Sequence, residues 1–393
     1  MRITDHALNR LSVLKAIRRG GAVARTDLPR QTGLSSGSIT QLTAELLRRG
    51  LVIERKDVTR RPGRPRTFLE INVAGGIVIG ASLAGAGQLN VAFVDLMGNR
   101  LLSKDVRLGV HRTLGTLAAE IGANLSAAID TSPYAIGDIS RVGIALPAIV
   151  DNGRGEVHFM TTFPVGGPVA FARPISDHLG LPVMIENDLT CMARAEHWFG
   201  RARDLQTFTL MHVGYSIGSA QYVDGLPQSG ANGLNPEFGH VKSSTGDDAY
   251  SCYCGGHGCL TAYASMYGIL KAAGDLEDAQ FPHILDLDDH FERFLDRADA
   301  GDAAANRALE RAASYLGLAI ANFMNSTDPG HILLTFATAR FLSAVAGPLH
   351  HAIEAHAVPA VFAHTKVELI LADQDWRWKG TAALALEQTY LGS

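Results

Sequence analysis

Three of the four cysteines in this 393-residue chain lie within one short segment, Cys252-Tyr253-Cys254-Gly255-Gly256-His257-Gly258-Cys259. Cysteines this close together are typical of a metal site in a reducing compartment, because a disulfide framework spreads its cysteines along the chain. The intervening glycines let the backbone curl around a single ion. Three thiolates and one imidazole fill a tetrahedral zinc shell and leave no position for a catalytic water, so we expect a structural Zn²⁺ site.

The fourth ligand of that site is left open by the spacing. His257 lies inside the cysteine segment, and His240 closes the preceding motif Glu237-Phe238-Gly239-His240. We predict the ligand set His240, Cys252, Cys254 and Cys259, with His257 as the competing histidine. The alternative is a loop with three reduced thiols and no metal. Cys191 lies in an apolar, helical context and is expected in the core.

Charge divides the chain into a basic head and an acidic body. Residues 1–70 contain 15 Lys and Arg against 6 Asp and Glu, and residues 71–393 contain 20 against 33. A basic head on an acidic body indicates that the head contacts nucleic acid. No apolar run is long enough to cross a membrane, and the N-terminus has no secretory apolar core, so we expect a cytoplasmic protein without membrane contact.

The head has the pattern of a winged helix-turn-helix. An apolar periodicity ends at Gly20-Gly21, Gly33 supplies a tight turn, and a third helix follows from Ser35 or Ser36 to Arg49. Short polar side chains near the start of that helix suit base edges in the major groove. Two β-prone stretches flank an Arg/Pro-rich tip, which predicts a wing that reaches phosphates or a minor groove. The predicted DNA contacts are Ser36, Ser38, Thr40, Gln41, Arg60, Arg61 and Arg64.

The body alternates strand and helix patterns, which predicts an α/β fold. Two such sets suggest two lobes with a ligand cleft between them. We expect three domains: 1–70 as the winged helix-turn-helix, 71–190 as a first lobe completed by about 375–393, and 191–374 as a second lobe with the zinc loop.

The segment Glu237–Cys259 resembles the signature of the ROK family (repressors, open reading frames and sugar kinases), and residues 7–71 resemble the winged helix of its repressors. The family includes glucose, N-acetylglucosamine and xylose repressors of bacteria. The resemblance implies an actin-like/hexokinase-like two-lobed fold. It also implies that Glu237 and His240 bind sugar hydroxyls, with His240 on zinc as well, and that Asn187 and Asp188 join the sugar site. In the kinases, the aspartate at the position of Asp188 is the catalytic base.

Several positions depart from the kinase pattern. The first phosphate loop reads Leu83-Ala84-Gly85-Ala86-Gly87, without the family's aspartate and threonine. Tyr215 adds bulk to the second phosphate loop, and Thr335-Phe336-Ala337 replaces a glycine run near the adenosine. Because phosphoryl transfer needs a phosphate cradle and a metal-holding carboxylate, these losses argue against an enzyme. Asp188 is then a sugar-hydroxyl acceptor.

Two further departures concern the ligand. Thr261 stands where kinases and many repressors carry a sugar-binding glutamate, and the segment 161–167 lacks the usual tryptophan of another sugar-lining loop. We therefore expect an altered effector, with Asn187, Asp188, Glu237, His240 and Thr261 as its contacts.

Three functions are compatible with these patterns. The preferred hypothesis is a DNA-binding transcriptional regulator, a repressor of sugar metabolism, that binds an operator as a homodimer or homotetramer and is controlled by a sugar effector. The runner-up is a sugar kinase with a regulatory DNA-binding head. The third is a DNA-binding protein without an effector.

Overall fold

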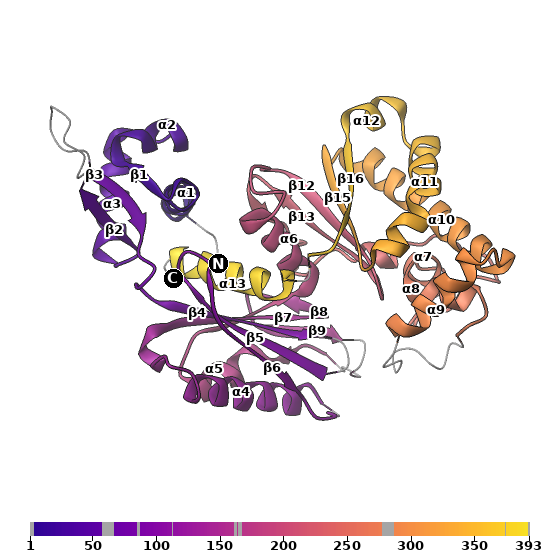
Figure 1. Cartoon of the computed structure of the whole chain (residues 1–393), viewed down its shortest axis with the longest axis horizontal. Helices are drawn as coiled ribbons and strands as arrows, with labels where there is room; N and C mark the ends of the chain where they lie inside the picture. Colours follow the sequence, from indigo (N-terminus) through magenta and orange to yellow (C-terminus); the bar gives the residue numbers. More distant parts are fainter. Residues whose placement is uncertain are drawn as a thin grey trace.

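The computed structural model of the chain is an elongated α/β molecule with a small head, a first lobe and a second lobe (Figure 1). It describes residues 4–56, 67–84, 87–111, 113–160, 163, 167–276, 287–373 and 375–391. No helix within these ranges is both long enough and apolar enough to cross a membrane.

In its described residues, the head consists of three α-helices, a short 3₁₀ helix (Arg25–Asp27) and a small sheet. Its elements are α1 (Asp5–Gly20), β1 (Ala22–Ala24), α2 (Leu28–Thr32), α3 (Ser36–Arg48), β2 (Val52–Lys56) and β3 (Thr67–Ile71). Ser35 caps α3, since its hydroxyl accepts a hydrogen bond from the Ser38 N–H at 3.1 Å. Gly33 follows the C-terminal end of α2 and Gly50 follows that of α3. Both adopt left-handed backbone conformations, which the turns there require.

The wing has one more strand than the sequence predicts. β2 and β3 pair antiparallel, and β1 adds to the other edge of β3 to give the order β1-β3-β2. β1 is only three residues long, too short to show a periodicity. The predicted wing arginines Arg60, Arg61 and Arg64 lie outside the described residues.

The first lobe is built on a five-stranded sheet of order β11-β7-β4-β5-β6. Its strands are β4 (Ile77–Ala84), β5 (Gln88–Asp95), β6 (Arg100–Arg107), β7 (Ile139–Leu146) and β11 (Val183–Asn187). Helices α4 (Leu114–Asp130) and α5 (Ala172–Leu179) cover the face that carries Ile79 and Phe93. A small antiparallel sheet extends from it, with β8 (Ala148–Asp151), β9 (Glu156–Met160) and β10 (Val169–Ala170).

The opposite face of the first sheet is covered by a helix from the C-terminus, α13 (Trp376–Leu391). Alternation along β4 explains how both faces are buried, because Ile79 packs under α4 and Val78 packs under α13. α6 (Asp188–Phe199) lies alongside α13. Gly380 permits this close packing, since a Cβ there would lie 2.1 Å from the Cys191 carbonyl oxygen. Cys191 is buried, as expected.

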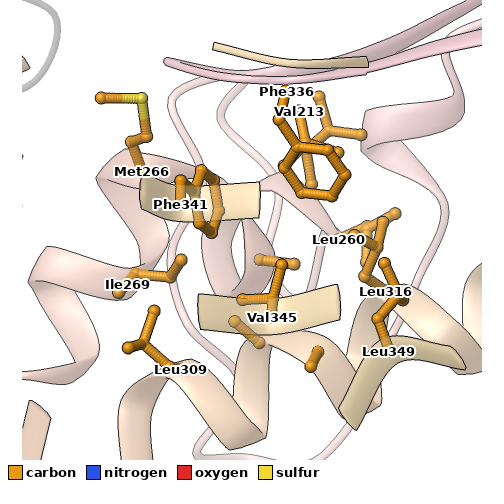
Figure 2. Packing of buried hydrophobic residues seen from close by; sticks show 14 of the residues in the cluster. Val213, Leu260, Met266, Ile269, Leu309, Leu316, Phe336, Phe341, Val345 and Leu349 are labelled. Carbon is orange, nitrogen blue, oxygen red and sulfur yellow. The ribbon is translucent and has the colours of Figure 1, made fainter. Parts of the chain in front are cut away.

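The second lobe repeats the plan with the sheet β14-β13-β12-β15-β16. Its strands are β12 (Phe208–Val213), β13 (Ile217–Val223), β14 (Leu226–Pro227), β15 (His331–Phe336) and β16 (Lys366–Leu371). Its helices are α7 (Thr261–Ala264), α8 (Met266–Ala272), α9 (Leu287–Asp299), α10 (Ala303–Thr327), α11 (Ala339–His356) and α12 (Pro359–His364). Figure 2 shows the core between sheet and helices, where Phe336 from β15 lies above Phe341 and Val345 of α11.

The head and the first lobe share one apolar core. Leu14 of α1 and Leu46 of α3 belong to the same cluster of buried side chains as Leu386 and Tyr390 of α13. In Figure 1 the C-terminal end of α13 lies beneath the head, next to α1. Apolar burial is the dominant favourable term in packing, so the head is held against the body rather than tethered by a linker alone.

Candidate functional site

A histidine and three cysteines converge on one point at the edge of the second lobe. The ligand atoms of His240, Cys252, Cys254 and Cys259 all lie within 4.8 Å of one another. His240 ends the short 3₁₀ turn Phe238–His240, and the cysteines come from the loop before α7. Among the described residues His257 is not part of this group, and its carbonyl oxygen instead accepts a hydrogen bond from Lys242 at 2.6 Å.

Two of the spacings between the four ligand atoms match a tetrahedral metal site. The sulfurs of Cys254 and Cys259 are 3.7 Å apart, and the sulfur of Cys252 is 3.6 Å from Nδ1 of His240. Zinc–sulfur bonds of about 2.3 Å and zinc–nitrogen bonds of about 2.0 Å at tetrahedral angles place such atoms about 3.8 and 3.5 Å apart. The cluster therefore has the donor set and the dimensions to hold a metal ion with four protein ligands.

Two glycines make the loop possible. Gly255 and Gly258 have φ values of 85° and 75°, which side chains rarely tolerate. A Cβ on Gly258 would also lie 1.8 Å from the carbonyl oxygen of Ser244. The loop can thus close only with glycine at this position.

The His240 ring points its two nitrogens in different directions. Nδ1 faces the cysteine sulfurs, and Nε2 lies 4.0 Å from Oε2 of Glu237. With a metal on Nδ1, Nε2 would carry the proton, and at 4.0 Å it is too far from Glu237 for a direct hydrogen bond. Burial lowers the pKa of His240 and raises that of Glu237.

Lys242 supplies a positive charge that the sequence patterns did not single out. Its Nζ lies 3.2 Å from the sulfur of Cys259, and this hydrogen bond raises the pKa of Lys242. Three thiolates and a divalent ion would leave one net negative charge, which Lys242 would offset. Its only sequence signal is a position two residues after His240.

The predicted sugar residues Asn187 and Asp188 lie at the start of α6. Asn187 caps this helix, with Oδ1 accepting hydrogen bonds from the N–H groups of Leu189 and Thr190 at 2.9 and 3.2 Å. Asp188 Oδ1 accepts from the Leu189 N–H at 2.9 Å. Burial raises the pKa of Asp188 to about 7, and the negative charge of Glu237 adds to this shift.

The second lobe reaches α6 through the loop that precedes Glu237. Asn235 donates a side-chain hydrogen bond to Thr190, and a Cβ on Gly233 would lie 3.3 Å from the Asp151 carboxylate. These contacts bring Glu237 close enough to Asp188 for the two carboxylates to interact. Carboxylates from both lobes thus lie within electrostatic range of each other, and hydroxyl donors would satisfy them.

Thr261 is completely buried, with 0% of its surface exposed. Its hydroxyl is 3.4 Å from the Ile217 N–H and takes part in a hydrogen bond with Tyr253. The Tyr253 ring packs edge-on against His240, with centroids 5.3 Å apart. Tyr253 is a second residue that sequence reasoning missed, because nothing in the cysteine pattern shows where the side chain between two ligands points.

The kinase-like loops take ordinary packing roles in the described residues. Tyr215 packs against the core of the second lobe, and Phe336 lies within it. The Thr335 hydroxyl bonds to the Met211 carbonyl oxygen at 3.1 Å and to Nδ1 of His212 at 2.9 Å. Residues 85–86 of the first loop and most of 161–166 lie outside the described part of the chain.

The predicted reading side chains lie along the outer side of α3. Ser36, Thr40 and Gln41 are exposed and Ser38 is half-buried, while Ile39 and Leu42 face the core. Local hydrogen bonds hold two of the hydroxyls, from Thr40 to the Ser36 carbonyl oxygen at 2.9 Å and between Ser35 and Ser38 at 2.9 Å. The exposed Gln41 side chain has the length to reach a base edge.

Known proteins resemble this chain over most of its length. The family model described as ROK family matches residues 79–387. A putative xylose repressor from Caldicellulosiruptor sp. (strain Rt8B.4) is 27% identical over 344 residues, covering 84% of this chain and 84% of its own. A solved ROK family transcriptional regulator, described as a homologue of the E. coli MLC protein, superposes with a TM-score of 0.80 at 26% identity, covering 98% of this chain and 97% of that one.

A kinase shares the body fold. A ROK family glucokinase from Streptomyces griseus, solved with glucose and AMPPNP, superposes with a TM-score of 0.62 at 22% identity. It covers 79% of this chain and 99% of its own. This likeness concerns the fold alone, and it leaves about a fifth of the present chain without a counterpart.

Proposed function

The chain belongs to the ROK family, and from this membership we propose that it is a DNA-binding transcriptional regulator of sugar metabolism genes. In this proposal the head binds a double-stranded operator, and a sugar or sugar derivative bound between the lobes changes the affinity for DNA. The main support for this proposal is α3, whose exposed outer side is polar. This helix belongs to a basic head that packs against a ROK body.

The head has the features that operator binding needs. Ser36, Ser38, Thr40 and Gln41 would face bases, and the wing residues Arg60, Arg61 and Arg64 would contact phosphates or a minor groove. We propose that the protein acts in the cytoplasm as a repressor, as the names of its relatives suggest. A homodimer or homotetramer would place two heads on half-sites about one helical turn apart.

The effector site lies where the two lobes meet. Asp188 and Glu237 would accept sugar hydroxyls, His240 would donate its Nε2 proton, and Asn187 would hold the start of α6. Thr261 would act indirectly by holding Tyr253 against His240. We propose Zn²⁺ on His240 and the three cysteines, where it would fix the imidazole orientation and serve no chemical step.

A sugar kinase with a regulatory head is the second candidate. The observation that favours it is Asp188, because a carboxyl whose pKa is about 7 suits a general base. Against it stand the changed phosphate loops, with Leu83 in place of an aspartate and Tyr215 in the second loop. The preferred function therefore assigns no catalysis to this chain.

Selection of duplex DNA from a random pool by the full-length protein tests the proposal. We expect enrichment of a two-fold symmetric sequence, with an affinity that falls steeply as salt rises because phosphate contacts release counterions. D-xylose, D-glucose and N-acetyl-D-glucosamine then serve as probe effectors in gel shifts and thermal shifts. A protein that selects no sequence refutes the regulator.

The same preparation decides between the candidates. Sugar-dependent ATP turnover that disappears in Asp188→Ala establishes the kinase. DNA selection without a response to any probe sugar favours a regulator that works without these effectors.

A further inference from the structure

Helix α6 connects the sugar residues with the DNA-binding head. It begins at Asp188, directly after Asn187, and ends at Phe199 beside α1. Twelve helical residues span about 18 Å, so one rigid element reaches from the effector site to the head.

A buried polar chain runs along this helix. Glu186 Oε1 accepts a hydrogen bond from the Asn187 N–H at 3.0 Å, and Oε2 accepts from Arg194 Nη2 at 3.3 Å. Arg194 also pairs with Glu387 of α13, and the Trp198 indole N–H donates to Glu387 Oε1 at 2.6 Å. Glu186, Arg194, Trp198 and Glu387 are each only 5–6% exposed.

The head contacts Trp198, at the end of this network of buried polar side chains. Arg18 of α1 donates from Nη1 to the Trp198 carbonyl oxygen at 3.2 Å, and its guanidinium lies 4.9 Å from the centre of the Trp198 ring. Lys15 lies 3.2 Å from Nε2 of His197. These cations sit at the C-terminal end of α6, where the helix dipole favours positive charge.

The network of buried polar side chains also extends from Glu186 to the hairpin of β8 and β9, near the proposed effector site. Asn152, in the turn between β8 and β9, donates from Nδ2 to Glu186 Oε2 at 2.9 Å. Asn187 donates from its own Nδ2 to the Ala148 carbonyl oxygen at 3.1 Å. A ligand that shifts Asn187 or this hairpin must therefore disturb Glu186, whose two oxygens accept hydrogen bonds from three donors.

We propose that Arg194 is a positioning residue that couples the effector site to the head, through Glu186 on one side and Glu387 and Trp198 on the other. A buried charge pair tolerates few arrangements, because a displaced partner leaves an uncompensated charge. Movement of Glu186 is therefore passed to Trp198 and to α1. The inference rests on the proposed function, since it assumes that a sugar near Asn187 alters DNA binding.

The first test compares Trp198→Phe with Trp378→Phe in the full-length protein. Trp198→Phe keeps an aromatic ring under Arg18 but removes the indole donor to Glu387. Trp378 is the matched control, because its indole N–H donates to Asp375 at 2.9 Å, outside the polar chain. The readouts are DNA affinity without sugar, thermal shift by the three probe sugars, and the ratio of DNA affinities with and without sugar.

We expect Trp198→Phe to keep the thermal shift and to keep the sugar-free DNA affinity within about twofold. The ratio should fall from about tenfold, an ordinary allosteric coupling, toward onefold. Trp378→Phe should retain the wild-type ratio. An unchanged ratio in Trp198→Phe overturns the assignment.

The second test needs no ligand. Hydrogen exchange of α1 amides is measured in wild type, Asn152→Ala, Trp198→Phe and the double variant. We expect Asn152→Ala to speed exchange of α1 several-fold in the wild-type background and to have no effect when Trp198 is already phenylalanine. Exchange in α1 that ignores Asn152→Ala overturns the coupling. If the probe sugars leave wild-type DNA binding unchanged, only the proposed effector control fails, and exchange still decides the coupling.

Discussion

The Nε of Arg10, in the first helix, donates a hydrogen bond to the carbonyl oxygen of Tyr390, in the last, at 2.8 Å. The same guanidinium pairs with Glu45 of α3. Arg49 adds a bond of 2.8 Å to the Thr389 carbonyl oxygen, so two head arginines cap the C-terminal end of α13. The first and last helices therefore contact each other, and the head docks on the body through α13.

We predict that Arg10→Met loosens this docking. Arg10 is only 6% exposed, and hydrogen bonds to charged groups contribute about 2 kcal/mol each. The free energy of unfolding measured in urea should fall by about 4 kcal/mol, because both the bond to Tyr390 and the pair with Glu45 are lost. Arg173→Met, which changes an exposed pair on α5, should alter it by less than about 0.5 kcal/mol. Equal effects of the two changes would refute the docking role.

Metal content should separate His240 from His257. We expect purified protein to carry one zinc per chain by elemental analysis, and Cys254→Ser or His240→Ala to lose most of it. His257→Ala should keep it, because His257 lies outside the ligand group in the described structure. Chelation should lower the melting temperature of wild type, since metal binding contributes to folding. Full zinc in His240→Ala would identify a different fourth ligand.

Asp188 should make stability depend on pH. Its pKa is raised from 3.8 to about 7 by burial, so between these values the folded state binds its proton more tightly than the unfolded state. The free energy of unfolding should therefore fall as pH rises from about 4 to about 7 and stay reduced above that. Asp188→Asn should flatten this change. Urea melts at pH 5 and pH 8 measure the difference, and an identical difference in both proteins contradicts the burial effect.

Sugar affinity should also depend on the ionisation of Asp188, but it should increase as pH rises. An ionised carboxylate accepts hydroxyl donors more strongly than a protonated one. Binding of a responsive probe sugar, measured by calorimetry, should strengthen as pH rises through about 7, and Asp188→Asn should remove that dependence. Affinity that weakens over this range would place Asp188 outside the effector contacts.

Two head residues should have different effects on DNA binding. Gln41→Ala should reduce discrimination against single base changes by about 1–3 kcal/mol while leaving non-specific affinity unchanged. Arg64→Ala should weaken binding to all duplexes alike and lower the slope of log affinity against log salt by about 1. Competition gel shifts at several salt concentrations measure both. If Gln41→Ala lowers affinity for every duplex equally, α3 is not the reading helix.

Local sequence patterns predicted many of the helices and strands. α3 was predicted within one residue because its cap, apolar face and Gly50 stop all lie in one short segment. β6 was not predicted, since it is an exposed edge strand whose Arg, Lys and Asp residues hide the alternation. The segment Thr261–Ala272 forms two helices, α7 and α8, because the Ser265 hydroxyl caps α8 by accepting from the Gly268 N–H.

The sequence by itself determined the α/β alternation, the polar-fronted helix of the head and the cysteine cluster, because each depends on neighbours a few residues apart. Only the tertiary structure decided that His240 rather than His257 faces the sulfurs, that Tyr253 contacts Thr261, and that Arg194 joins Glu186 to Glu387. Residues such as Glu186 and Glu387 are 201 positions apart, and no periodicity relates them. Their shared contact with Arg194 is set by the packing of α6 on α13.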